Sequence, residues 1–184
     1  KQQFDDSSVE PDSPTTPSES LEALNFDDEQ LPKAQGLTGS RLRSYAFAVL
    51  TRREYSKAEL IEKLALYAID RDEVLKLVDE LATQNYQSDQ RVAEMMLSSQ
   101  KRKGKGPNRI KLALKSKKID TSLIQEELKE TDWTEQAYQL KVKKFGLPVE
   151  KEAKLKAKQI RFLVYRGFEM DAIIKAITRK ENDF

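Results

Sequence analysis

The segments Ser56–Leu64 (SKAELIEKL), Gly106–Leu114 (GPNRIKLAL) and Lys156–Val164 (KAKQIRFLV) place apolar residues at matching positions, 50 residues apart. A fixed period of this length is typical of stacked modules and not of one irregular globule. The sequence therefore predicts a long binding surface instead of a single pocket. The coinciding residues are Leu60, Ile110 and Ile160, followed by Leu64, Leu114 and Val164.

Start and stop signals frame helices around these segments. Ser56-x-x-Glu59 is a capping box, in which the hydroxyl and the carboxylate satisfy backbone donors of the first turn. Proline after Gly106 is tolerated at a first helical position, and glycine is a common stop. The other start signals are Asp70-x-x-Glu73 and Asp132-x-x-Glu135, and the stops are Gly146 and Gly167.

Apolar residues recur every three or four positions, and no segment alternates long enough to form a strand. We therefore predict an all-α fold of about nine helices, arranged as tandem three-helix modules in an elongated, curved array. The expected modules are residues 39–87, 88–131 and 132–184. Val74, Ile124 and Ile174 extend the 50-residue register into the last helix of each module.

Residues 1–38 differ from the rest, because nine acidic residues face two lysines (net charge −7) and four prolines interrupt any helix. We predict a disordered, solvated tail. Two further interpretations stay open: a short helical contact through Leu21 and Leu24, or folding of the tail over the basic remainder (net charge +9) in competition with an anionic partner.

The chain has no cysteine and no histidine, which excludes disulfides, thiolate or imidazole zinc sites and Ser–His–Asp triads. Its carboxylates are scattered, and no Gly-rich phosphate loop is present. We therefore expect no enzyme, no cofactor and no metal site. No apolar stretch is long enough for a membrane span and no secretory signal opens the chain, so a cytoplasmic monomer is expected.

From Lys101 to Lys118 the chain holds nine basic residues and no acidic one, which indicates an anionic partner. Helical geometry places part of this run on one stripe, and a second stripe follows at the equivalent register positions of the third module. In the first module Ile61 and Ala65 occupy these positions. The predicted partner-binding residues are Lys101, Arg102, Lys103, Lys105, Arg109, Lys111, Lys115 and Lys118, then Lys154, Lys158, Arg161, Tyr165 and Arg166.

Three aromatic residues are expected near module junctions. Trp133 is interpreted as a staple that closes the junction between the second and third modules. Phe162 points away from the predicted core and must be covered by a neighbouring module or a partner. Tyr165 lies on the basic stripe, where it either stacks on a base or packs between modules.

Four segments follow one another along the folded part of the chain: Tyr55–Leu64, Ser88–Ala93, Lys103–Ile110 and Arg161–Phe168. In this order they resemble the signature segments of the RecX family, the bacterial regulators of the RecA recombinase. The resemblance covers roughly residues 40–180. It departs at Val92, where the family usually has an aromatic residue, and at Lys118, which replaces a common glycine.

This resemblance implies an all-helical array of three-helix modules that binds in the groove of the RecA filament on single-stranded DNA. It also implies inhibition of ATP hydrolysis, strand exchange and co-protease activity in recombinational repair and the SOS response, without catalysis. The residues alone leave an alternative open. Helix-turn-helix-like modules with a lysine-rich surface can bind DNA without sequence specificity through phosphate contacts.

Overall fold

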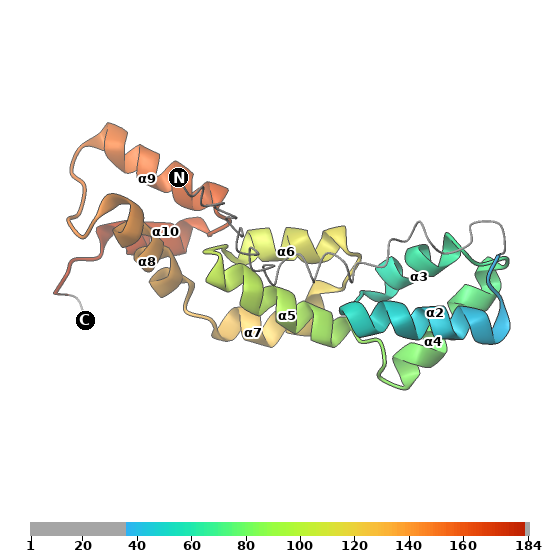
Figure 1. Cartoon of the computed structure of the whole chain (residues 1–184). Helices are drawn as coiled ribbons and strands as arrows, with labels where there is room; N and C mark the ends of the chain where they lie inside the picture. Colours follow the sequence, from blue (N-terminus) through green and yellow to red (C-terminus); the bar gives the residue numbers. More distant parts are fainter. Residues whose placement is uncertain (1–35, 183–184) are drawn as a thin grey trace, which may run out of the picture. The chain divides into compact units, whose positions relative to one another are not determined.

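The structure, a computed structural model, describes residues 36–182, so the predictions for residues 1–35 lie outside the described part of the chain. Nine α-helices, one 3-10 helix and no β-strand occupy these described residues, which confirms the predicted all-α fold. The helices are α2 (Gly39–Arg52), α3 (Lys57–Ala65), α4 (Arg71–Thr83), α5 (Asp89–Arg102), α6 (Pro107–Ser116), η2 (Thr121–Ile124), α7 (Gln125–Glu130), α8 (Trp133–Phe145), α9 (Ala153–Tyr165) and α10 (Met170–Thr178) (Figure 1).

Consecutive helices pack in groups of three, which confirms the tandem three-helix modules (Figure 1). Module one contains α2, α3 and α4, module two contains α5, α6 and η2 with α7, and module three contains α8, α9 and α10. Each module has its own apolar core, and Val92 is buried in that of module two, so the unusual residue is accommodated. The core of module two is Val92, Ala93, Leu97, Ile110, Leu114, Ile119, Ile124 and Leu128; that of module three is Ala137, Tyr138, Leu163, Phe168, Ile173, Ala176 and Ile177.

The 50-residue register holds between modules one and two but is wrong by one residue in module three. Val164 and Ile174 are 49% and 42% exposed, whereas their neighbours Leu163 and Ile173 are fully buried. The spacing from Leu114 to Leu163 is therefore 49 residues. Because one residue rotates a helix position by about 100°, the basic stripes predicted on modules two and three are not equivalent surfaces.

Modules two and three share the same turn after their second helix. The Ile119 amide donates to the Leu114 carbonyl at 3.0 Å, and the Phe168 amide donates to the Leu163 carbonyl at 3.1 Å. The preceding residues, Lys118 and Gly167, both have positive φ, at 54° and 97°. Lysine pays a steric cost in this left-handed region that glycine does not.

Modules one and two are joined mainly by side chains. Ser56 begins α3 with the predicted capping box, and its buried hydroxyl also donates to the Lys117 carbonyl at 2.9 Å. Glu59, the other half of the capping box, forms an ion pair with the Lys117 ammonium at 3.0 Å. A second ion pair joins Arg91 to Glu54 at 3.0 Å. Opposite charges therefore pair across this junction.

Module one begins earlier than the sequence predicted. Leu37, assigned to the tail, exchanges backbone hydrogen bonds with the turn before α4, at Tyr67 and Ile69. The start signal at Asp70 is confirmed, because its carboxylate accepts from the Asp72 amide at the start of α4. The Glu73 carboxylate accepts a hydrogen bond from the Thr38 hydroxyl at 2.8 Å.

Among residues 36–182, no helix is long and apolar enough to span a membrane.

Candidate partner-binding surface

Modules two and three meet backbone to backbone. The Gly106 amide donates to the Arg166 carbonyl at 2.8 Å, and the Asn108 amide donates to the Gly167 carbonyl at 3.0 Å. The first amides of an α-helix have no partner within the helix, so carbonyls of module three satisfy the start of α6. The junction thus unites two of the family-like sequence segments, Lys103–Ile110 and Arg161–Phe168.

Two glycines make this approach possible. A Cβ atom on Gly106 would lie 2.5 Å from the carbonyl carbon of Gly167, and one on Gly167 would lie 2.6 Å from the Arg109 backbone nitrogen. Both distances are shorter than van der Waals contact. Side chains at either position would therefore push the two modules apart.

Arginine side chains and Trp133 extend the junction on both sides. Arg109 donates from Nε to the Tyr165 carbonyl at 2.7 Å, and its guanidinium lies 4.5 Å from the Tyr165 ring centroid. The Arg166 Nη1 donates to the Lys103 carbonyl at 3.0 Å. Trp133 packs against both cores and donates to the Leu128 carbonyl, which confirms its predicted role as a staple.

A groove of about 450 Å³ lies at this junction, between the end of α5 and the helices α8 and α9. We call it the cationic groove, because six of its lining side chains are basic and none is acidic. The lining also includes two glutamines and two large apolar side chains. The cations are Lys101, Arg102 and Lys103 of module two with Lys143, Lys144 and Arg166 of module three; Gly104, Gln136, Gln139, Leu140 and Phe162 complete the lining.

Phe162 organises the module-three wall of the cationic groove. Its ring packs edge-on against Phe145 of α8, with centroids 5.5 Å apart, so this contact comes from its own module and not from the neighbouring module or partner that the sequence predicted. The Lys144 ammonium and the Arg166 guanidinium lie 5.0 and 5.3 Å from the same centroid. Cations within about 6 Å of an aromatic face are attracted to it, so Phe162 positions two of the groove's charges.

The structure distributes the predicted site residues over several surfaces. Four of them line the cationic groove (Lys101, Arg102, Lys103 and Arg166), and two lie beside it at the junction (half-buried Lys105 and Arg109). Four others form an exposed stripe along α9, consisting of Lys154, Lys158, Arg161 and Tyr165.

The remaining predicted residues lie on α6 and just after it. Lys111 lines a second hollow, Lys115 is exposed, and Lys118 lies close enough to Glu62 to lower the pKa of that carboxyl, although the hydrogen bond from Arg71 lowers it more. Module one also provides Glu59 as the partner of Lys117. The basic run is therefore not one uncompensated stripe, because acidic residues distant in sequence approach its far end.

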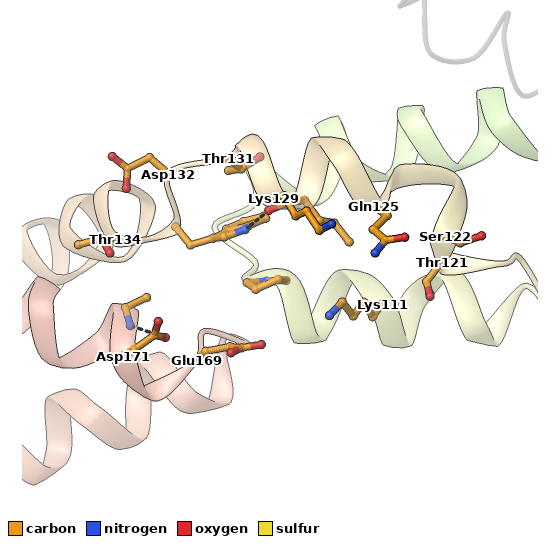
Figure 2. A pocket seen from close by; sticks show the side chains of 14 residues that line it. Lys111, Thr121, Ser122, Gln125, Lys129, Thr131, Asp132, Thr134, Glu169 and Asp171 are labelled. Carbon is orange, nitrogen blue, oxygen red and sulfur yellow. Dashed lines mark hydrogen bonds between the residues drawn. The ribbon is translucent and has the colours of Figure 1, made fainter.

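The second hollow, of about 690 Å³, carries mixed charge (Figure 2). Lys111 and Lys129 line it from module two, whereas Glu169 and Asp171 line it from module three. Carboxylates would repel a polyanion here. The two hollows beside the same junction therefore differ in the partners that they can accept.

Lys143 and Lys144 of the cationic groove escaped the sequence analysis. A basic pair in the last turn of a helix is ordinarily explained by the helix dipole. Only the packing of α8 beside the end of α5 shows that these charges add to Lys101–Lys103. The described residues contain no cluster of acidic side chains suited to a metal ion.

Tandem three-helix modules with a cationic groove at a module junction define an all-helical modular protein. The RecX family models for the second and third three-helix domains match residues 88–128 and 130–177. Regulatory protein RecX of Acinetobacter baylyi is 68% identical over 158 residues, which cover 86% of this chain and 99% of that protein. The chain belongs to the RecX family of regulatory proteins.

More distant relatives share the sequence and the fold. Regulatory protein RecX of Chromobacterium violaceum is 38% identical over 146 residues, covering 79% of this chain and 94% of the relative. The crystal structure of RecX from Lactobacillus salivarius superposes with a TM-score of 0.66 at 23% identity, over 75% of this chain and 93% of that chain. At this identity the superposition shows a common fold.

Proposed function

We propose that this chain binds the RecA filament on single-stranded DNA and inhibits its ATPase, strand exchange and co-protease activities. It acts without catalysis, as a cytoplasmic monomer, in recombinational DNA repair and the SOS response. Membership of a regulatory family supports this role, and the cationic groove is the observation that carries it. Its lining has six cations and no acidic residue, so the groove attracts an anionic assembly such as a filament on DNA.

DNA-stimulated ATP hydrolysis by RecA tests the proposal. The ratio of DNA to recombinase is held fixed while this protein is titrated. A filament regulator inhibits at concentrations far below that of DNA sites, because one molecule affects many recombinase subunits. Inhibition only when DNA is saturated would contradict the proposal.

That second outcome would favour sequence-nonspecific DNA binding, for which the groove is also suited.

Charge reversal tests the contribution of each basic surface to filament binding. Lys111→Glu with Lys115→Glu tests the stripe on α6, and Lys143→Glu with Lys144→Glu tests the cationic groove. We expect both pairs to weaken filament binding, and Lys76→Glu with Lys175→Glu, exposed on modules one and three, serves as a control of equal charge change.

A further inference from the structure

We infer that the cationic groove is a binding site for the phosphodiester backbone of a single-stranded nucleic acid, and that the bound strand holds modules two and three together. The inference rests on the proposed function in one respect: the strand that the groove binds is the single-stranded DNA of the RecA filament. The chemistry of the site comes from the groove itself.

The cations of the groove are divided equally between the two modules. Lys101, Arg102 and Lys103 belong to α5 and its end, whereas Lys143, Lys144 and Arg166 belong to module three. Like charges on opposing walls repel each other. A polyanion between the walls converts this repulsion into attraction on both sides, so its binding favours the closed junction.

The groove charges are available to a ligand. Within residues 36–182, none of the six makes an ion pair: Lys101 bonds the Thr131 hydroxyl at 3.2 Å, and Arg166 bonds the Lys103 carbonyl. Both interactions use neutral acceptors and leave the positive charges uncompensated. Ammonium and guanidinium groups in this state are suited to phosphate oxygens.

A nucleic-acid strand fits the lining better than an acidic protein surface. Folded protein surfaces normally intersperse both signs of charge, whereas a phosphodiester backbone presents negative charge alone, at regular intervals. The apolar side chains Leu140 and Phe162 and the amides of Gln136 and Gln139 give the sugar and base of a flexible strand sequence-independent contacts.

Binding of a fluorescent oligo-dT to the full chain, without recombinase, tests the site. Lys143→Glu with Lys144→Glu lowers affinity at least about tenfold, whereas the control pair Lys76→Glu with Lys175→Glu leaves most of it. Replacement of Lys143 and Lys144 by Gln reduces the slope of log affinity against log salt by about 1.4, because each lost phosphate contact on a single strand contributes about 0.7. Equal losses for the groove and control pairs would overturn the site.

Amide hydrogen exchange tests the closure of the junction. The Gly106 and Asn108 amides donate to module-three carbonyls, so separation of the two modules breaks both hydrogen bonds. Oligo-dT slows their exchange severalfold, whereas the Lys57 amide, which bonds Asp89 at the other junction, is unaffected. Unchanged exchange at Gly106 and Asn108 under saturating oligo-dT would overturn the closure.

Two further results separate this inference from the proposed function. Poly-glutamate that binds as tightly as oligo-dT, with the same loss in the groove variant, would overturn the nucleic-acid assignment. If the groove variant binds oligo-dT normally but no longer inhibits RecA, the inference fails and the proposed function stands. If oligo-dT binding requires the groove but the unaltered protein never inhibits RecA, the inference stands and the proposed function fails.

Discussion

The two module junctions use opposite chemistry. Modules one and two are joined by paired charges, such as Glu59 with Lys117 and Arg91 with Glu54. Modules two and three are joined by backbone hydrogen bonds at Gly106 and Asn108, beside six cations that form no ion pair within residues 36–182. The first junction therefore pairs opposite charges, whereas the second has an excess of positive charge among the described residues.

This difference locates function within a repeated fold. All three modules bury apolar residues between their own helices, so these buried residues build the scaffold. The junctions differ because their side chains come from two modules at once. The following variants test the two junctions and the turn beside them, in order of decreasing effect.

Gly167→Ala should cause the largest loss. Its Cβ atom would lie 2.6 Å from the Arg109 backbone nitrogen, and φ is 97°. Gly146→Ala is the control for positive φ without the close contact, because φ is 91° and ψ is 176° but the nearest atom, on Pro148, is 3.6 Å away. We expect a loss of about 3 kcal/mol or more for Gly167→Ala, and about 1–3 kcal/mol for Gly146→Ala, whose backbone lies in a region that side chains rarely adopt. Urea unfolding measures both, and equal losses would show that the glycine contact is unimportant.

Ser56→Ala should weaken the other junction by about 2 kcal/mol. The hydroxyl caps α3 through the Glu59 amide and also donates to the Lys117 carbonyl. Ser88→Ala removes a comparable cap on α5, where Ser88 accepts from the Arg91 amide within one module. The Ser88 variant should lose about 1 kcal/mol. A Ser56 loss no greater than this would argue against the intermodule hydrogen bond.

Lys118→Gly should stabilise the chain by about 0.5–1 kcal/mol. Lysine at φ 54° carries a cost of about 1–2 kcal/mol that glycine avoids. Glycine also raises the conformational entropy of the unfolded chain, which offsets part of this stabilisation. The result would give module two the residue that module three has at the same turn position, Gly167. A decrease in the denaturant midpoint would contradict the assignment of strain.

The helices and modules could be predicted because their signals are local. Ser56, Pro107 and Asp132 mark helix starts, and the apolar periodicity marks the cores. The register of module three could not be predicted, because Ile160 is the more apolar residue but the structure buries Gln159. The Gln159 Oε1 has no hydrogen-bond partner among residues 36–182. Ile160 is half-buried and packs against the same core, so hydrophobicity alone displaced the predicted buried face of α9 by one residue.

Only part of the cationic groove could be predicted, because charge compensation, like the register, depends on residues that are distant in the sequence. Lys101–Lys103 stand out in sequence because no acidic residue is near them in the chain. Whether a charge is compensated depends on residues far away, such as Glu59 for Lys117. Lys143 and Lys144 join the groove only through the packing of α8, which no local pattern specifies.

The smallest expected effect is a pH dependence confined to the first junction. Burial alone would raise the pKa of Glu59, but the hydrogen bond from the Ser56 amide and the Lys117 charge outweigh it, so the pKa is lowered. A lowered pKa contributes stability that is present above the unfolded-state value and is lost as pH falls through the folded value.

Glu59→Gln should therefore reduce stability by less than about 1 kcal/mol at neutral pH, and this difference should shrink as pH falls below the ordinary glutamate value of 4.5. Exchange of the Lys57 amide, which bonds Asp89 of module two, reports whether the junction itself opens. Glu80→Gln, which breaks a pair with Arg43 inside module one, is the control. A junction loss that is constant with pH would assign the role of Glu59 to packing.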